Sequence, residues 1–203
     1  MAEHAAGRPE HKFDPARAGR LDAPERDAYL PDDRLIDLLE LEGGETVVDY
    51  GAGTGRLALA AERRLGGRGR VVAVDESEEM LAHLRARLSA AGSGVEPFLI
   101  AANRVPLPDA SADRVIAVNL LHEVRGEAAL AEMRRLLRPE GILLVADWER
   151  GRDPERPTGP PEHILYTEDE AVAELERAGF AVDRREGGFP YHFSLLAQPV
   201  AAR

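Results

Sequence analysis

The stretch VVDYGAGTGRLALA places three glycines at alternate positions beside a carboxylate. No Cβ atom is present at Gly51, Gly53 and Gly55, so a ligand can approach their backbone closely and positive φ is allowed. Asp49 stands two residues before the first glycine, and Asp75 follows 20 residues after the last. At that position a carboxylate can bind the hydroxyls of a ribose. These residues predict a nucleoside site, and the alternative is a tight strand–helix turn that holds no ligand.

The glycine spacing narrows the choice of ligand. A dinucleotide-binding fingerprint reads G-x-G-x-x-G, whereas here the third glycine comes one residue early. The chain has no G-x-x-x-x-G-K-[ST] motif, so a phosphate-binding P-loop is excluded. Two acids beside the glycines suit a nucleoside with positive charge better than a pyrophosphate. A nicotinamide-dependent oxidoreductase is therefore the less favoured interpretation.

Polar side chains also follow two later strand-like segments. His122 and Glu123 come after DRVIAVN, while Asp147 and Trp148 end GILLVADW. Histidine titrates near neutral pH, so His122 is the leading candidate for a general base. Its alternative role is a polar lining residue or a hydrogen-bond donor at the start of a helix. His163, in a proline-rich loop, is a second candidate base.

These side chains need a scaffold that brings strand ends together. Amphipathic helical patterns alternate with five short segments rich in β-branched residues, which are TVVDY, RVVAVD, VEPFLI, DRVIAVN and GILLVADW. That alternation predicts a doubly wound α/β sheet, whose ligands lie at the carboxyl ends of its strands. Two further strand-like segments, FAVDRREGG and HFSLLAQP, predict an antiparallel hairpin at one edge of the sheet.

Several helix boundaries are marked by capping residues. Ser77 is predicted to cap the helix that carries Leu81, Leu84 and Leu88, and Thr167 with Glu170 forms a possible capping box for another. A helix over EAALAEMRRLLRP is predicted to stop at the following proline and glycine. One helix is predicted for residues 22–44, and residues 149–163 are predicted to be a functional loop. The first twenty residues are interpreted as a mobile, solvated arm.

Composition restricts the class of protein. At 203 residues the chain is predicted to form one domain of the soluble globular type. The net charge of −11 opposes binding to the phosphates of nucleic acid. The absence of cysteine excludes disulfides, thiolate metal sites and cysteine nucleophiles, so no metal is expected and a cytoplasmic location fits. We expect neither a signal peptide nor a membrane-spanning segment.

In this order the motifs resemble those of the class I S-adenosylmethionine-dependent methyltransferases, over residues 45–198. VVDYGAGTGRLA resembles the first motif of that family, VVAVDESEEML the second, and VPLPDASADRVIAVNLLHEV the third and fourth. EMRRLLRPEGILLVADW and YTEDEAVAELERAGFAV are similar to the family's later segments. The resemblance implies a seven-stranded, doubly wound, Rossmann-like methyltransferase fold, mostly parallel with an antiparallel C-terminal hairpin.

The resemblance also implies a cofactor, S-adenosyl-L-methionine, and roles for individual residues. The three glycines would pass under its methionine part and ribose, Asp49 would organise the loop, and Asp75 would hold the ribose hydroxyls. Asp49 as a turn-stabilising acid and Asn119 as a strand terminator are the alternatives. In the family an acid often accepts from the adenine amine, where this chain has Ala101. Further contacts are implied around the adenine and the ammonium, at Glu76, Met80, Ala102, Asn103 and Asn119.

The implied activity is methyl transfer to a small organic acceptor through an oxygen, nitrogen or carbon nucleophile. NLLHE stands where members that methylate amino groups often have an Asn/Asp-Pro-Pro-aromatic motif, and arsenite methyltransferases need cysteines that this chain lacks. The alternative is an S-adenosylmethionine-binding regulatory protein without transferase activity. Residues 1–44 are predicted as an N-terminal arm and helix, which could fold over the site as a lid with Tyr29, and residues 45–203 as the cofactor-binding domain. No oligomeric state is assigned.

Overall fold

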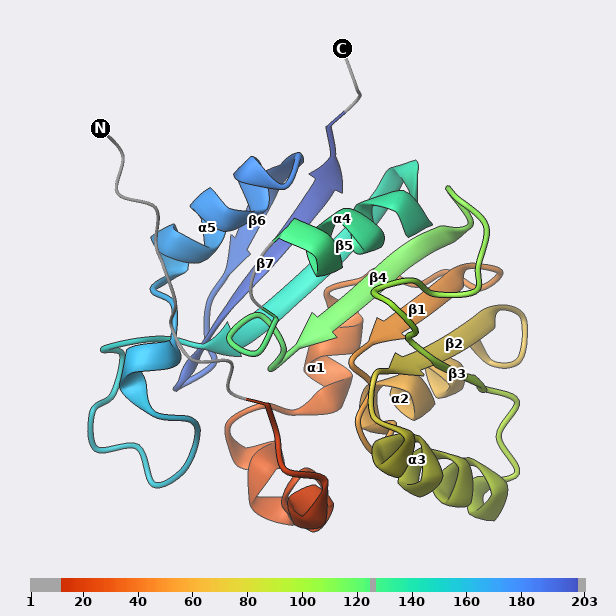
Figure 1. Cartoon of the computed structure of the whole chain (residues 1–203), viewed down its shortest axis with the longest axis horizontal. Helices are drawn as coiled ribbons and strands as arrows, with labels where there is room; N and C mark the ends of the chain where they lie inside the picture. The colour runs from red at the N-terminus through yellow and green to blue at the C-terminus, as the bar shows by residue number, and fades with distance from the viewer. Residues whose placement is uncertain (1–11, 125–126, 201–203) are drawn as a thin grey trace.

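A seven-stranded sheet organises the part of the chain that the computed structural model describes, residues 12–124 and 127–200 (Figure 1). The strand order is β3-β2-β1-β4-β5-β7-β6. Within the described residues the strands are β1 (Thr46–Tyr50), β2 (Arg70–Asp75), β3 (Glu96–Leu99), β4 (Ala112–Val118), β5 (Leu137–Trp148), β6 (Phe180–Glu186) and β7 (His192–Pro199).

The order of the strands reverses at β1. This strand lies between β2 and β4 and runs parallel to both, with Val48 paired to Val72 on one side and to Val115 on the other. A doubly wound sheet opens a crevice at the carboxyl ends of the strands where its order reverses. β7 lies between β5 and β6 and is antiparallel to both, so that Ala146 pairs with Ser194. The predicted fold class is therefore confirmed.

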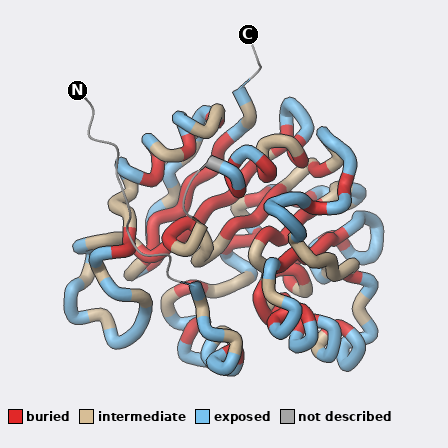
Figure 2. The backbone as a smooth tube through the Cα atoms, viewed as in Figure 1, coloured by how far each residue is buried: buried red, intermediate tan, exposed pale blue. Residues whose placement is uncertain are grey.

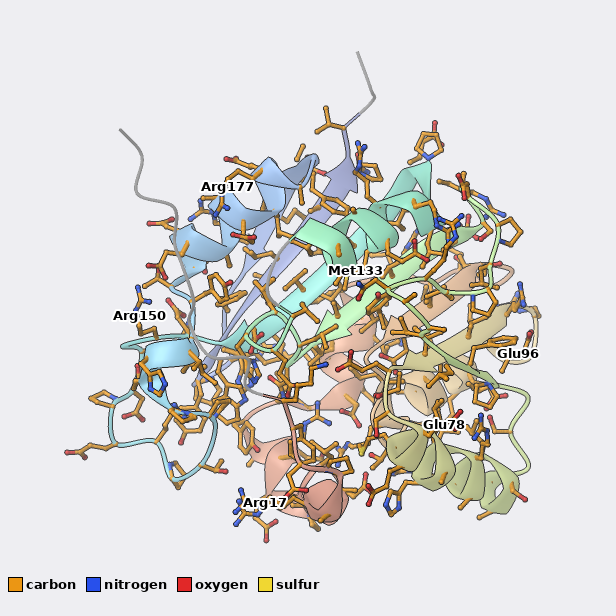
Figure 3. All side chains as sticks on the ribbon, viewed as in Figure 1. Arg17, Glu78, Glu96, Met133, Arg150 and Arg177 are labelled. Carbon is orange, nitrogen blue, oxygen red and sulfur yellow. The ribbon has the colours of Figure 1, made fainter. Side chains whose placement is uncertain are left out.

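Helices cover both faces of this sheet, and the longer ones among the described residues are α2 (Arg56–Leu65), α3 (Glu78–Ala91), α4 (Glu127–Leu136) and α5 (Glu168–Arg177). Neighbouring residues of β1 serve opposite faces: Val47 packs with α2 and α3, and Val48 with α4 and α5. Figure 2 shows the buried strands at the centre of the molecule, and Figure 3 shows Met133 between α4 and the sheet. Burial on both faces explains the nearly continuous apolar strand sequences.

The predicted helix caps are confirmed. The Ser77 hydroxyl accepts a hydrogen bond from the Met80 N–H at 3.2 Å at the start of α3. At the start of α5, the Thr167 hydroxyl accepts from the Glu170 N–H at 3.3 Å, and the Glu170 carboxylate accepts from the Thr167 N–H at 2.9 Å. Such reciprocal bonds satisfy amides that have no partner inside the helix. The sequence therefore fixes these helix starts locally.

The helix predicted for EAALAEMRRLLRP ends earlier than expected. α4 stops at Leu136, and β5 begins at Leu137, which pairs with Ala112 of β4. Pro139 disfavours helical conformation in the residue before it, so the chain is already extended there. The pairing with β4 then draws Leu137 into the sheet, and this contact between distant parts of the chain has no local sequence signal.

The single helix predicted for residues 22–44 is wrong. That range holds two short elements instead, the 3-10 helix η2 (Pro24–Ala28) and the helix α1 (Asp32–Asp37), and a further 3-10 helix, η1 (Pro15–Arg20), comes before it. Pro31 takes an extended conformation at the boundary between η2 and α1, and a proline lacks the N–H that a continuous helix would need there. Leu30 and Leu35 are nevertheless fully buried in the core on the α2 face.

The described part of the N-terminal arm contacts the rest of the molecule. The Lys12 ammonium lies 2.6 Å from the Glu76 carboxylate, and the Phe13 N–H donates to the Glu123 carboxylate at 3.2 Å. Residues 12–20 are thus mostly exposed, as a solvated arm would be, but they form η1 and contact the rest of the molecule. Residues 1–11 lie outside the described part, and the mobility of the arm stays a prediction. Figure 1 shows this segment, in red, at the end of the sheet to which the β4 arrow points.

The long loop after β5 has little regular structure, as expected. Residues 149–161 form turns and bends, and one short 3-10 helix, η3 (Glu162–Ile164), precedes α5. Within residues 12–124 and 127–200, every helix is too short or too polar to cross a membrane.

Candidate active site

The glycine loop, residues 51–55, follows β1 at the point where the strand order reverses. All three of its glycines have positive φ, of 74° at Gly51, 55° at Gly53 and 82° at Gly55. The N–H groups of Gly51 and Ala52 both donate to the Val74 carbonyl of β2, at 2.8 and 2.9 Å. A Cβ atom at Gly51 would lie 2.8 Å from a methyl carbon of the Leu120 side chain. A side chain at Gly51 would therefore clash with Leu120, so glycine is required there.

Asp49 lies at the base of this loop. Its side chain is 2% exposed, and its carboxylate accepts a hydrogen bond from the Ala58 N–H of α2 at 2.9 Å. Burial raises the pKa of Asp49 to about 7, although the Ala58 hydrogen bond opposes that shift. A cation placed beside Asp49 would stabilise its ionised form.

Asp75 connects the end of β2 to the glycine loop. Its carboxylate accepts from the Gly53 N–H at 3.0 Å and from the Ser77 N–H at 2.9 Å. Burial raises the pKa of Asp75, and these backbone hydrogen bonds act in the opposite direction. Asp49 and Asp75 thus lie on adjacent strands, one beneath the loop and one beside it.

Of the other residues predicted near an adenine, one is buried at the glycine loop and three are exposed. Met80 is buried, with its terminal methyl 3.5 Å from the position of a Cβ at Gly53. Glu76 is exposed and pairs with the Lys12 ammonium. Ala102 and Asn103 are exposed and have positive φ, and they form a tight turn closed by two hydrogen bonds between the backbones of residues 101 and 104. Of these four residues, the structure brings Met80 directly to the glycine loop.

His122 and Asp147 form a buried pair at the carboxyl ends of β4 and β5. The imidazole Nδ1 lies 2.7 Å from the Asp147 Oδ1, and the His122 N–H donates to the Asp147 Oδ2 at 3.0 Å. The side chains are 4% and 1% exposed. A carboxylate only accepts, so Nδ1 carries a proton in this hydrogen bond, and Nε2 is the nitrogen that a neutral ring would use as a base. Asp147 thereby fixes the ring in the form that a base requires.

Glu123 stands beside the imidazole on its other edge. Its Oε1 lies 3.7 Å from the His122 Nε2, and its Oε2 accepts from the Phe13 N–H. Burial raises the pKa of Glu123 to about 7, while the His122 charge acts to lower it. The imidazole therefore has a carboxyl group near each of its two nitrogens, which favours the protonated ring once a proton arrives.

The Asn119 side chain contacts a residue of β7. Its Oδ1 lies 3.0 Å from the Nε2 of His192 on β7. His192 is fully buried, and burial lowers its pKa to about 3, so its ring is neutral. Asn119 itself has a φ of 55° and its N–H donates to the Ala146 carbonyl of β5 at 2.8 Å. The backbone of Asn119 remains at the strand end that the sequence predicts for a cofactor contact.

An aromatic cluster, made of Tyr29, Trp148, Tyr191 and His192, lies next to the His122–Asp147 pair. The Trp148 and His192 rings are 4.2 Å apart, and the Tyr29 ring lies 5.5 Å from Trp148 and 5.6 Å from Tyr191. The Trp148 N–H donates to Asp147 at 2.7 Å, which ties the cluster to the candidate base. Tyr29 joins from the N-terminal segment. The cluster joins three distant parts of the chain, so no local pattern around Tyr191 could predict its place there.

His163 is not brought into this group. It is exposed on η3 and makes no hydrogen bond or ion pair with any residue that the structure describes. Its neighbour Ile164 is buried against Trp148 instead. Of the two candidate bases, the structure joins His122 alone to a carboxylate partner.

Comparisons with known proteins agree with this geometry. A family model described as a methyltransferase domain matches residues 47–141. A SAM dependent methyltransferase from Aquifex aeolicus superposes with a TM-score of 0.86 at 31% identity, and the match covers 93% of this chain and 100% of that one. The PH0226 protein from Pyrococcus horikoshii superposes with a TM-score of 0.74 at 18% identity, over 88% and 93% of the two chains, which shows the fold alone.

Curated relatives match over a shorter stretch. The ubiquinone/menaquinone biosynthesis C-methyltransferase UbiE of Paraburkholderia phymatum is 40% identical over 112 residues, which is 55% of this chain and 46% of that protein. The protein of the same name from Bordetella avium is 39% identical over 115 residues, or 56% and 45% of the two chains. This chain therefore spans about half the length of the curated relatives it matches.

The fold, the glycine loop and the similarity to the Aquifex aeolicus protein over its whole length define the class. This chain belongs to the S-adenosylmethionine-dependent methyltransferases. The cofactor is S-adenosyl-L-methionine. The site fits it, because Gly51 and Gly53 offer bare backbone and the buried carboxyl groups of Asp49 and Asp75 suit a sugar and two positive charges. A pyrophosphate would place negative charge among these acids, so the nicotinamide interpretation is set aside.

Proposed function

We propose that this chain transfers a methyl group from S-adenosylmethionine to a small organic acceptor, with His122 as the base that removes the acceptor's proton. The observation that carries the proposal is the buried His122–Asp147 pair, whose imidazole and carboxylate are 2.7 Å apart at the same sheet edge as the glycine loop. Family membership supports the methyl-donor half of the reaction, and this pair supports the acceptor half.

On the cofactor side, each residue has a proposed task. The glycine loop passes beneath the methionine part and ribose, Asp75 accepts from the ribose hydroxyls, and Asp49 faces the positive charges. When bound, the cofactor supplies a methyl group on a sulfonium that is already activated, so the protein mainly aligns the acceptor and excludes water. The proposed contacts around the adenine and at the strand end are Glu76, Met80, Ala102, Asn103 and the backbone of Asn119.

On the acceptor side, His122 moves the proton. Its Nε2 takes a proton from the acceptor's hydroxyl or amine group, while Asp147 holds the Nδ1 proton and stabilises the imidazolium that forms. Glu123, beside Nε2, adds a second negative charge as it ionises. A base of this kind contributes about 10²–10⁴-fold to a rate. His163 stays a predicted base, but no carboxylate of the described residues pairs with it.

The surroundings of His122 point to a planar acceptor. The aromatic cluster packs the rings of Tyr29 and Trp148 together next to the His122–Asp147 pair, and aromatic rings pack favourably against other flat rings. The curated relatives are named C-methyltransferases of ubiquinone/menaquinone biosynthesis. For this chain we propose a ring carbon activated by a neighbouring hydroxyl as the first acceptor to test, with oxygen and nitrogen acceptors next.

A small acceptor is favoured over nucleic acid, and the N-terminal segment is proposed to close over it. The net charge of −11 opposes a phosphate-rich partner. Residues 1–44 are proposed as the lid and residues 45–203 as the cofactor-binding domain, although Leu30 and Leu35 already pack into the core beneath α2. This lid would carry Tyr29 over the acceptor.

The test is an acceptor screen with methyl-labelled cofactor. Purified protein is incubated with planar phenols, hydroxylated quinols, enols and aromatic amines, and label in the organic product is counted. We expect transfer to at least one hydroxylated ring. Binding of the cofactor without transfer to any acceptor would favour the alternative, a regulatory S-adenosylmethionine-binding protein. Family membership and the His122–Asp147 pair argue against that alternative.

A further inference from the structure

The proposed base, His122, has to lose a proton after every methyl transfer. In the transfer the sulfonium becomes a neutral thioether, and the acceptor exchanges one hydrogen for the methyl group, so one proton is released at each turnover. In the proposed function that proton goes to the His122 Nε2. A base that stays protonated cannot act again. The proton must therefore reach water before the next acceptor reacts.

The Asp147 side of the pair is closed to solvent. The side chains of His122 and Asp147 are 4% and 1% exposed. The Asp147 carboxylate already accepts from the His122 Nδ1, from the His122 N–H and from the Trp148 N–H. A buried carboxylate whose oxygens are all engaged holds its donors in place and does not pass a proton to water. The proton is therefore expected to leave from the other edge of the ring, at Nε2.

Glu123 stands at that edge of the ring and is more exposed than the pair. Its Oε1 lies 3.7 Å from the His122 Nε2, and its side chain is 19% exposed. Its Oε2 accepts from the Phe13 N–H at 3.2 Å, which leaves Oε1 as the oxygen on the ring side. A hydrogen bond to Nε2 needs about 2.7–3.2 Å, so the carboxyl group has to approach the ring by less than about 1 Å.

The charges around Glu123 suit a group that takes up and releases a proton. Burial raises the pKa of Glu123 to about 7, the His122 charge lowers it, and Asp147 and Asp75 raise it. The ordinary pKa of histidine is about 6.5. Proton transfer from an imidazolium to such a carboxylate is therefore nearly balanced, and the carboxylic acid gives its proton up again at neutral pH.

We infer that Glu123 carries the acceptor's proton from the His122 Nε2 to water and so regenerates the base between turnovers. The inference rests on the proposed function, in which His122 is the base. In this step the Nε2–H bond of the imidazolium breaks and an Oε1–H bond forms, which leaves a neutral imidazole and a neutral carboxylic acid. Glu123 then loses the proton to water and is a carboxylate again. Glu123 acts through His122 and is a proton carrier, not a second base for the acceptor.

The test separates the first turnover from the later ones. Wild-type protein and Glu123→Gln are mixed with excess methyl-labelled S-adenosylmethionine and the best hydroxylated ring from the acceptor screen, and samples are quenched at set times. Glu123→Gln should form its first product at close to the wild-type rate. Later turnovers should be slower by about 10²-fold, the low end of the range for a positioned proton-transfer group. Glu174→Gln, at another partly buried acid, on α5, is the matched control.

A small buffer gives a readout that a structural role would not change. Imidazole can enter the emptied acceptor site and take the proton from Nε2. Added imidazole should therefore restore the later turnovers of Glu123→Gln in proportion to its concentration and leave wild-type turnover unchanged. Equal slowing of first and later turnovers, no slowing, or no rescue by imidazole overturns the role of Glu123 while the proposed function stands. Absence of label transfer by wild-type protein overturns both.

A second measurement needs no variant and no acceptor. In wild-type protein with ¹⁵N-labelled histidine, the His122 Nε2 resonance should follow two titration steps, one from the ring and one from Glu123 near pH 7, because coupled groups report each other's ionisation. A single step contradicts proton exchange between the two side chains. Thermal unfolding verifies that Glu123→Gln and Glu174→Gln are folded.

Discussion

The two sides of the active-site edge are built in different ways. The proposed cofactor side consists of the glycine loop with Asp49 and Asp75, and it comes from one short stretch of chain spanning β1 and β2. The proposed acceptor side consists of the His122–Asp147 pair and the aromatic cluster, and it is assembled from the N-terminal segment, β4, β5 and β7. The proposed cofactor side is thus encoded locally, whereas the proposed acceptor side depends on tertiary packing. Variants can test whether the two sides act independently.

The largest effect is expected for a variant of His122, which should lower turnover without changing cofactor affinity. His122→Asn keeps an N–H donor for Asp147 but has no titrating nitrogen. We expect turnover to fall by about 10²–10⁴-fold, because a general base is lost. Calorimetric affinity for S-adenosylhomocysteine should stay at the wild-type value. His83→Asn, at an exposed position on α3, is the control, and wild-type turnover in His122→Asn would remove the base from the mechanism.

The second prediction concerns how ionisation of Asp49 lowers the free energy of unfolding. The pKa of Asp49 is about 7 in the folded chain against 3.8 for an unperturbed carboxyl. Below pH 3.8 both states are protonated and Asp49 has no effect on stability. As pH rises, the unfolded chain loses this proton first, so the free energy of unfolding falls until the folded state also ionises near pH 7.

Asp49→Asn removes that titration while retaining an acceptor for the Ala58 N–H. Relative to wild type, its free energy of unfolding should rise by roughly 2–4 kcal/mol between pH 4 and pH 8, measured by urea unfolding without cofactor. Asp33→Asn, whose side chain is 86% exposed, should show no such trend. A difference between Asp49→Asn and wild type that does not change with pH contradicts the burial argument.

The third prediction concerns a variant of Asp75, which should weaken cofactor binding. Asp75→Ala removes the carboxylate proposed to hold the ribose and should reduce S-adenosylhomocysteine affinity by about 1.5–3 kcal/mol, the range for hydrogen bonds to charged groups. Titration calorimetry measures the loss. Glu79→Ala, an exposed acid in the first turn of α3, is the matched control. Unchanged affinity in Asp75→Ala would take Asp75 out of the site.

The smallest expected effect tests the shape of the glycine loop. Gly55 and Gly66 flank α2 and both have positive φ, but a Cβ at Gly55 would overlap the Leu84 side chain whereas Gly66 has open space. Gly66→Ala should cost about 1 kcal/mol from backbone strain. Gly55→Ala should cost about 1 kcal/mol more, because Leu84 must move. Equal thermal stability of the two variants would show that Leu84 yields freely.

Local signals account for what the sequence predicted correctly. Apolar β-branched runs predicted the strands, and Ser77 and the Thr167–Glu170 pair predicted helix starts, because each signal acts within a few residues. The acceptor side was predicted only in parts. His122 and Asp147 were each placed at a strand end, but their pairing depends on β4 and β5 being neighbours.

Residues whose role depends on distant contacts were missed. Tyr191 carries no motif, and it joins the aromatic cluster only because the chain before β7 packs against Tyr29 and Trp148. The single helix expected for residues 22–44 does not form because Pro24 and Pro31 each stand at the start of a new element. His163 was placed in the correct loop, yet the loop's own packing leaves it exposed.

A crystal structure with S-adenosylhomocysteine tests the division of the site most directly. The account predicts the nucleoside against residues 51–55, its ribose hydroxyls within hydrogen-bond distance of the Asp75 carboxylate, and its sulfur directed toward the space beside the His122 Nε2. Adenosine bound elsewhere on the chain, or a sulfur that faces away from His122, would contradict it.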